Sequence, residues 1–169
     1  LNPNYAGANY NLGNTLKDLR KMDEAEKSFR KAILINPDYA EAHNNLGNIM
    51  KFHDRLEDAE ASFRKAILID PDYAEAHNNL GNIMKSHDRL EDAEACYKKA
   101  IAIKPDYAQA YSNLGINFKK FSKLGEAEAS FRKAIHLDQK YAQAHCNLCL
   151  ILFYNEDFDS AIQCIEKAN

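Results

Sequence analysis

Tryptophan is absent from this chain, and glycine and proline are scarce, with six and four copies among 169 residues. Alanine, leucine, lysine and glutamate are abundant instead, and these residues favour helices over strands. The sequence holds no apolar run close to the roughly 20 residues that a membrane-spanning helix requires. These absences favour a helical protein and give no reason to expect a membrane as partner.

A strong excess of either charge is also missing, since the formal net charge is −3. Nucleic acids and anionic membranes attract strongly basic surfaces, so neither is an expected partner. The cysteines Cys96, Cys146, Cys149 and Cys164 cluster late in the chain and form no spaced disulfide framework. We therefore expect reduced thiols and a cytoplasmic protein.

The first residues, Leu1-Asn2-Pro3, have neither the basic region nor the apolar region of a signal peptide. The chain also begins without methionine. We therefore expect a fragment of a longer protein, in which a targeting signal could lie outside the sequence.

Residue sets that carry out chemistry are missing as well. Cys146 and Cys149 form one C-x-x-C pair beside His145, but a structural zinc site normally needs two such pairs. The sequence suggests no Ser/His/Asp set and no glycine-rich phosphate loop. We predict a protein that is not an enzyme and that binds no metal or cofactor.

What the sequence does contain is a repeat of 34 residues. Residues 38–71 and 72–105 differ at only six positions, and residues 4–37 and 106–139 follow the same template more loosely. Residues 140–169 follow it until the chain stops, so we expect a last unit that is truncated and has no capping helix. Such a period is typical of repeat architectures.

Each unit reads as two amphipathic helices, predicted at about 39–53 and 56–69 in the second unit. Asp38 with Glu41 and Asp54 with Glu57 have the spacing of capping boxes at the two helix starts. Proline ends the second helix of each of the first three units, as Pro37, Pro71 and Pro105. One such hairpin cannot enclose a core, so we predict that the five units stack into a single array over residues 1–169.

Glycine recurs inside the first helix of the first four units, as Gly13, Gly47, Gly81 and Gly115. Glycine costs a helix interior about 1 kcal/mol relative to alanine. We predict that the second helix approaches so closely that no Cβ fits.

These residues resemble the signature of the tetratricopeptide repeat (TPR), with Leu46-Gly47, Ala59, Phe63, Ala66 and Pro71 at the characteristic spacing. The resemblance covers the whole chain and implies an all-α, right-handed superhelical solenoid of five hairpins. In that family the first helices line a concave face that binds extended peptides or partner helices. The family's glycine in the hairpin turn is replaced here by Arg20, Asp54, Asp88, Ser122 and Glu156. We expect these turns to survive at some cost, because Asp tolerates a left-handed backbone better than most residues.

Asparagine recurs on the expected inner face, although its amide disfavours helix interiors. One position holds Asn11, Asn45, Asn79, Asn113 and Asn147, and neighbouring positions hold Asn14, Asn44, Asn48, Asn78 and Asn82. A primary amide has two donors and an acceptor, so it can bond both the N–H and the C=O of a peptide backbone. We predict that these residues bind a peptide. The alternative is that the amides bond the neighbouring repeat or water.

This row resembles the asparagine ladder in the TPR region of O-linked N-acetylglucosamine transferases. The resemblance would assign peptide-backbone contacts to Asn11, Asn45, Asn79, Asn113 and Asn147. The basic residues of the two-carboxylate clamp of chaperone-binding TPR proteins are missing, because Tyr10, Asn44, Asn45 and Asn79 hold those positions.

Lysine forms a second row near the edge of the expected groove, as Lys17, Lys51, Lys85 and Lys119. This row could attract an acidic peptide, and the alternative is a solvated face balanced by nearby carboxylates. At the far end, Ile116, Leu150, Phe153 and Tyr154 replace polar residues of the earlier units. Such apolar surface could anchor a ligand, dock a further helix of the same protein, or pair with a second copy.

The leading hypothesis is a module that binds a peptide segment of a partner protein, as an adaptor or as the recognition arm of a larger protein. The alternative is a structural assembly module that self-associates through its uncapped C-terminal end. RNA binding resembles the function of pentatricopeptide hairpins. Those have 35-residue units and a markedly basic groove, whereas this chain has 34-residue units and an acidic balance.

Overall fold

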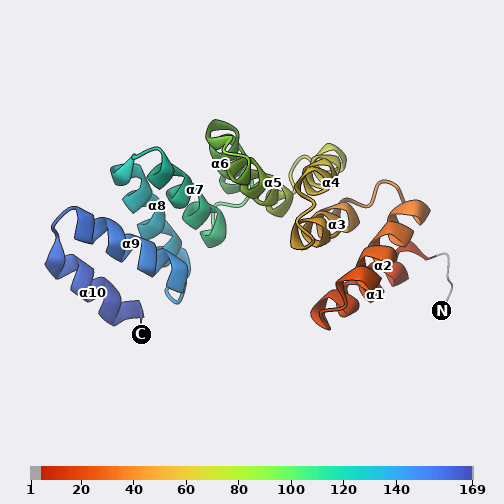
Figure 1. Cartoon of the computed structure of the whole chain (residues 1–169), viewed down its shortest axis with the longest axis horizontal. Helices are drawn as coiled ribbons and strands as arrows, with labels where there is room; N and C mark the ends of the chain where they lie inside the picture. Colours follow the sequence, from red (N-terminus) through yellow and green to blue (C-terminus); the bar gives the residue numbers. More distant parts are fainter. Residues whose placement is uncertain (1–4, 169) are drawn as a thin grey trace. The chain divides into compact units, whose positions relative to one another are not determined.

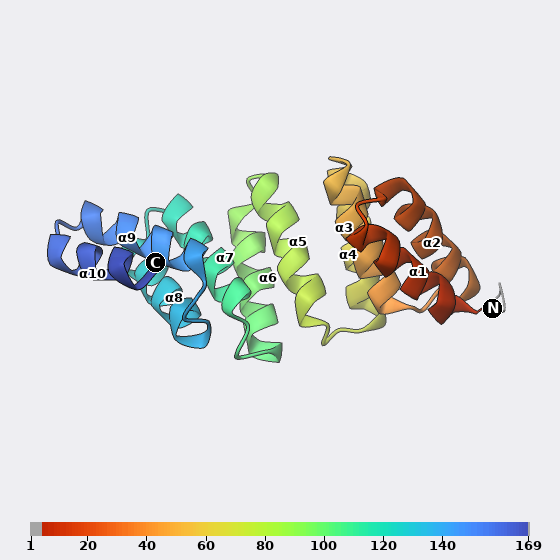
Figure 2. The same ribbon diagram turned by 90° about the horizontal axis from the view of Figure 1, so that it is seen from below.

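The computed structural model describes residues 5–168, with the side chains of 163 and 165–168 outside the description. Within that range the chain is helical throughout, and short turns join the helices (Figures 1 and 2). The helices are α1 (Ala6–Asp18), α2 (Met22–Ile35), α3 (Ala40–Phe52), α4 (Leu56–Ile69), α5 (Ala74–Ser86), α6 (Leu90–Ile103), α7 (Ala108–Lys120), α8 (Leu124–Leu137), α9 (Ala142–Tyr154) and α10 (Phe158–Ala168). The predicted all-α array of antiparallel helix pairs is confirmed.

The chain divides into two compact units, Leu1–Ile83 and Met84–Asn169, and the boundary falls inside α5. In the first unit, α2 packs against both α1 and α3, and α3 packs against α4. In the second unit, α6 packs on α7, α7 on α8, α8 on α9, and α9 on α10. In both units, therefore, a second helix also contacts the first helix of the next hairpin, as stacking requires.

Small and aromatic side chains of the second helices form the core. In α4, Ala59, Phe63 and Ala66 have no exposed surface, and the matching residues of α2, α6 and α8 are buried equally well. The second helices end two residues before Pro37, Pro71 and Pro105, as predicted. Buried side chains therefore recur at the repeat period.

The recurring glycines lie against aromatic rings. A Cβ on Gly13, Gly47 or Gly115 would lie 2.6–2.7 Å from Cε1 of Phe29, Phe63 or Phe131. Real Cβ atoms essentially never show contacts that short, and helical φ values do not require glycine here. The predicted close approach is therefore confirmed at these three positions, and the neighbour is the ring that the second helix inserts.

Residues other than glycine make the turns inside the hairpins. Arg20, Asp54, Asp88, Ser122 and Glu156 have φ values of 61°, 57°, 57°, 59° and 60°. At the second turn, Arg55 N–H donates to the Met50 carbonyl (2.9 Å) and Asp54 N–H donates to the Lys51 carbonyl (3.1 Å). The other four turns repeat both bonds, which is the Schellman pattern that ends a helix with one left-handed residue. The turns do survive without glycine.

The predicted capping boxes are wrong. α3 begins after Tyr39 and α4 after Arg55, and neither start has a side-chain cap. Asp54 cannot cap α4 because it is the left-handed residue that ends α3. In the loop before α3, the Asn36 carboxamide instead accepts the N–H of Asp38 at 3.2 Å. The turn is so short that Asp54, which the sequence pattern assigned to the start of α4, instead belongs to the end of α3.

Candidate peptide-binding face

The first helices of the first unit are joined by side-chain amides. Asn45 of α3 donates from Nδ2 to Asn14 Oδ1 (2.8 Å) and to the Tyr10 hydroxyl (3.3 Å), both on α1. Asn79 of α5 donates to Asn44 Oδ1 of α3 at 3.0 Å. We call the aligned polar side chains of α1, α3 and α5 in this unit, including Asn11, the amide face.

The link between Asn79 and Asn44 continues to a tyrosine hydroxyl, because Asn44 Nδ2 donates to the Tyr73 hydroxyl at 3.3 Å. Burial raises the pKa of Tyr73 well above its usual range, and the negative charges of Tyr10, Glu41 and Glu75 act in the same direction. The hydroxyl therefore stays neutral through the pH range in which an ordinary tyrosine is neutral.

These bonds change the predicted mechanism of peptide recognition. Both amide hydrogens of Asn45 are donated within the protein, so Asn45 cannot also donate to a ligand. Among the described residues, Oδ1 of Asn45 and Oδ1 of Asn79 accept no hydrogen bond. Asn45 therefore cannot bond both the N–H and the C=O of a peptide backbone, contrary to the prediction. It can only accept a hydrogen bond from a peptide N–H. Asn11 is exposed on the same row.

Several predicted ligand contacts are corrected by burial. Asn44 is 4% exposed, Asn78 0% and Asn113 7%, so these amides lie beneath the surface that a peptide would touch. Asn14, Asn48 and Asn82 are half-buried, and Asn14 is already an acceptor for Asn45. The structure leaves ligand contact itself a prediction for Asn11, Asn45, Asn48, Asn79 and Asn82.

In the second unit, Asn147 of the predicted asparagine row forms hydrogen bonds within the protein. Asn147 accepts from Lys119 Nζ at 3.1 Å and donates to the Gln143 carbonyl at 2.9 Å. Asn117, which the sequence analysis missed, is fully buried and donates to the Leu90 carbonyl at 2.9 Å. The sequence did hold a signal for this buried amide, because Asn117 replaces the isoleucine found at the same position one and two repeats earlier, as Ile83 and Ile49.

The lysine row lies partly in contact with the protein. Lys51 is exposed, while Lys17, Lys85 and Lys119 are half-buried. Lys119 is bound to Asn147, as described above. Lys17 and Lys51 have no ion pair within the described part of the chain.

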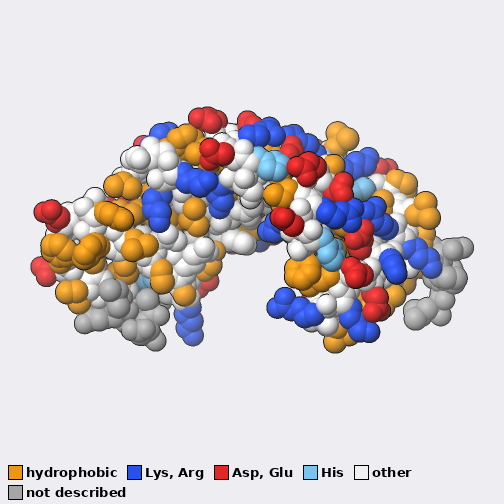
Figure 3. Space-filling model, in the orientation of Figure 1, with side chains coloured by type: hydrophobic (Ala, Val, Ile, Leu, Met, Phe, Trp, Pro, Cys, Tyr) orange, Lys and Arg blue, Asp and Glu red, His pale blue; other side chains and the backbone are white. Residues whose placement is uncertain are grey.

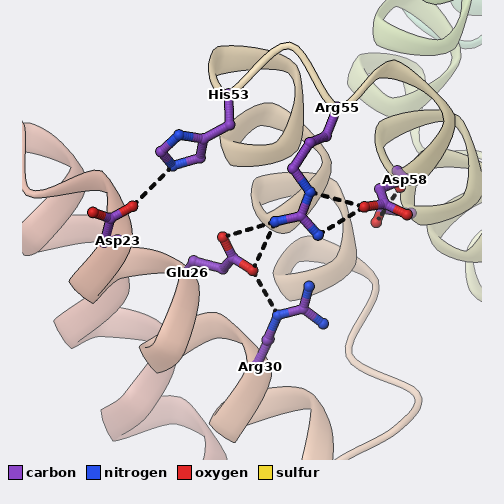
Figure 4. Close-up of polar contacts among 7 residues, drawn as sticks. Asp23, Glu26, Arg30, His53, Arg55 and Asp58 are labelled. Atoms are coloured by element: carbon purple, nitrogen blue, oxygen red, sulfur yellow. Dashed lines mark hydrogen bonds and ion pairs between the residues drawn. The ribbon is translucent and has the colours of Figure 1, made fainter.

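Charged side chains also join the first two hairpins (Figure 4). Arg55 bonds Asp58 at 2.7 Å and reaches Glu26 of the preceding hairpin at 3.3 Å, and Arg30 also bonds Glu26 at 2.8 Å. Partial burial would raise the pKa of Glu26, but the two guanidinium groups outweigh it and hold that pKa below its usual value. This carboxylate is therefore a structural link between hairpins.

The last hairpin exposes a cluster of large apolar side chains, visible over α9 and α10 in Figure 3. Phe153 and Phe158 pack edge to face with ring centroids 5.4 Å apart. The exposed fractions are 50% for Leu150, 61% for Phe153, 75% for Tyr154, 51% for Phe158 and 56% for Ile162. Ile116, predicted in the same patch, is half-buried. We call these five exposed residues the apolar end.

Sequence comparison decides the family. Three sequence models described as "Tetratricopeptide repeat" match residues 6–39, 28–61 and 108–141, one range each, and a fourth described as "TPR repeat" matches 54–88 and 87–120. The chain belongs to the tetratricopeptide-repeat family. TPR arrays are protein–protein interaction modules and are typically non-catalytic. No curated protein sequence matches this TPR chain.

Solved TPR structures share the fold. PilF of Pseudomonas aeruginosa is 23% identical, covers 96% of this chain and 74% of its own, and has a TM-score of 0.90. MamA of Desulfovibrio magneticus RS-1 is 18% identical (96% and 92% covered; TM-score 0.81). YrrB, described as a TPR protein with an unusual peptide-binding site, is 21% identical (99% and 86%; 0.74). At such identities the likeness establishes the fold alone. These matches do not show the finer resemblance to O-linked N-acetylglucosamine transferases, which stays a prediction.

Histidine holds one position of the first helix in three of the units, and tyrosine holds it in the fourth, as Tyr111. Nε2 of His43, His77 and His145 lies 3.0, 2.9 and 2.9 Å from the carbonyls of Pro37, Pro71 and Gln139. A carbonyl only accepts, so each ring donates from Nε2 and fastens the loop before its helix. These three histidines therefore share a structural role.

The four cysteines are free thiols. Burial beside Cys164 raises the pKa of Cys149 to about 12, so that thiol stays protonated. Within the residues described, no group of three or more His, Cys, Asp or Glu could hold a metal ion. In the same range, every helix is too short or too polar to span a bilayer.

Proposed function

We propose that this TPR array binds an extended segment of a partner protein along the amide face, through asparagine carbonyls that accept backbone N–H groups. The observation that carries the proposal is the set of acceptors on Asn11, Asn45 and Asn79, which recur once per repeat. Backbone N–H groups are present in every peptide whatever its side chains, so this grip tolerates many sequences.

The spacing supports an extended ligand. Packed helices lie about 8–10 Å apart, and an extended chain advances about 3.3 Å per residue. Each acceptor would therefore meet about every third N–H. Three acceptors span on the order of seven ligand residues, fewer than a ladder of five would. YrrB, a protein of the same fold, is described as having a peptide-binding site, which agrees with this use.

The test uses a random library of 12-residue peptides displayed on phage. Peptides selected by the parent protein are synthesised with a fluorescent label, and affinity is measured by fluorescence anisotropy. Replacing Asn45 and Asn79 together by alanine should weaken binding at least tenfold, while the control Asn155→Ala, an exposed residue outside the amide face, should not. Equal affinity of the double variant would remove the amide face from the proposal.

A chemical scan of the ligand tests the acceptor mechanism separately. Each backbone nitrogen of a selected peptide is methylated in turn, which removes one donor. Binding should fall sharply at residues about three apart and change little between them. A flat profile would contradict backbone recognition by asparagine carbonyls.

A second candidate function is assembly with another copy through the apolar end. Five large apolar side chains, each at least half exposed, meet at this hairpin, and such surface usually marks an interaction site. Light scattering over a concentration series should show the mass rising for the parent protein and staying monomeric for Phe153→Lys. Lysine is what the second hairpin carries at the same position, as Lys51. A monomer at every concentration would exclude this function.

A further inference from the structure

A cavity lies beside the amide face, within the first unit. It has a volume of about 270 Å³ and is lined by Lys17, Met22, Asn48, Ile49, Lys51 and Phe52. These residues come from the last turn of α1, the first residue of α2 and the last two turns of α3, which lie together in Figures 1 and 2. Small-molecule sites usually measure roughly 300–1,000 Å³, so this cavity suits a single side chain.

The lining combines an apolar interior with a cationic rim. Ile49 is 1% exposed, whereas Phe52 is 59% exposed and its ring packs edge-on against His53 with centroids 5.4 Å apart. Lys17 and Lys51 have no ion pair among the described residues, while Lys21, Lys98 and Lys120 all contact carboxylates. Two ammonium groups that form no ion pair within the described part of the chain lie beside an apolar cavity, and they complement an apolar group next to a carboxylate.

Phe52 belongs to this hairpin alone. The adjacent repeat, identical over most of its length, has Ser86 at the matching position, and the other units have Asp18, Lys120 and Tyr154. Ser86 also shows that serine is accepted in nearly the same helix. An aromatic wall in one repeat and not in its near-copy distinguishes one place along the face.

We propose that this cavity anchors one apolar side chain of the bound segment, and that Lys17 and Lys51 select an Asp or Glu beside it. The anchor rests on the proposed function, because Asn48 lies three residues after Asn45 on the same helix face. Backbone recognition along the amide face would supply affinity, and the cavity would set the register and the sequence preference.

The experiment repeats the phage selection with three proteins. The parent should enrich peptides with a Leu, Ile, Met or Phe that has Asp or Glu within two positions. The double charge reversal Lys17→Glu with Lys51→Glu should select Lys or Arg at those positions instead. The matched control reverses Lys27 and Lys31, two exposed lysines of α2, and should keep the parental preference.

A labelled peptide from the parental selection gives the second readout. Phe52→Ser should weaken it about tenfold and leave the helical circular dichroism unchanged, because Ser86 stands in the sister repeat. Raising the salt concentration should weaken binding to the parent more than to the Lys17/Lys51 variant, since exposed charges are screened.

The outcomes separate the two proposals. If peptides are selected that depend on Asn45 and Asn79 but share no apolar–acidic pair, the cavity is not an anchor and the proposed function stands. The same conclusion follows if the charge reversal selects the parental sequences. If the parent selects no peptide at all, both proposals fail.

Discussion

The two units carry different chemistry at matching positions of their first helices. Asn48 and Lys51 of α3 correspond, three repeats later, to Leu150 and Phe153 of α9. The former pair supplies an amide and an ammonium group to the rim of the apolar cavity, and the latter pair is half or more exposed in the apolar end.

The residues on the opposite side of the same helices hardly change. Ala42 and Ala144 are fully buried, Leu46 and Leu148 are 7% and 5% exposed, and both helices bury the residue four positions further on. The stacking side therefore fixes the fold, and the first-helix face is free to vary in chemistry. Polar recognition in one unit and apolar contact in the other can coexist on one scaffold.

The largest effect on stability should distinguish Gly47, which lies against an aromatic ring, from Gly125, which has no such neighbour. Gly47→Ala places a Cβ 2.7 Å from the Phe63 ring, and overpacking of this kind costs about 1–3 kcal/mol. We expect urea unfolding followed by circular dichroism to show a loss of about 2 kcal/mol. In the second unit, Gly125 has no neighbour within 4 Å, and Gly125→Ala should stabilise by up to about 1 kcal/mol. Equal shifts would mean that the close approach is not tight.

The next effect concerns the left-handed turns. A residue with a Cβ in this conformation costs about 1–2 kcal/mol, and Asp tolerates it better than most. Glu156→Gly in the second unit should therefore stabilise by about 1 kcal/mol and Asp54→Gly in the first by less, measured by thermal unfolding. Ala61→Gly, at an exposed helical position of α4, should instead destabilise by about 1 kcal/mol. A loss of stability at Glu156 would contradict the strain.

Pattern alone predicted most of the scaffold. The 34-residue period predicted the helix pairs, the core alanines and aromatics, and the glycine contacts, because each depends on a local sequence pattern that recurs from unit to unit. The capping boxes did not, because Asp54 and Glu57 fit the spacing while the three-residue turn places Asp54 at the left-handed end of α3. The amide bonds were also out of reach, since the donor direction of Asn45 depends on Tyr10 and Asn14 of another helix.

A smaller effect should separate the amides of the two units. Asn45→Ala loses two hydrogen bonds to α1 that are partly shielded from water, and a net bond contributes about 0.5–1.5 kcal/mol. We expect Asn45→Ala to destabilise by about 1 kcal/mol in urea unfolding. Asn147→Ala loses an exposed main-chain bond and the bond from Lys119, but the flexible lysine can turn to water, so this variant should cost less than Asn45→Ala. The reverse order would show that the amide face contributes little to packing.

The smallest effect should appear in acid. The pKa of Glu26 is held below its usual 4.5 in the folded protein, so its carboxylate stabilises the fold above pH 4.5 and loses this contribution as the pH falls through the lower folded pKa. The parent should therefore lose stability below pH 4.5 more steeply than Glu26→Gln, measured by urea midpoints. In the second unit, the matching carboxylate of Glu94 lies 3.9 Å from the Lys123 ammonium of the next hairpin. This contact is longer than the one between Glu26 and Arg55. Identical pH profiles of parent and variant would exclude this link.

The histidine contacts have a consequence for the spacing of hairpins. Each ring holds the preceding loop with an N–H that is present in both the neutral and the protonated form. Protonation therefore leaves the fastening bond in place, although burial lowers the pKa of His43 and favours the neutral ring. A phenylalanine at this position would have no side-chain N–H group and would leave the Pro37 carbonyl without its donor. The loops before α3, α5 and α9 are thus secured by a contact whose donor remains when the ring is protonated.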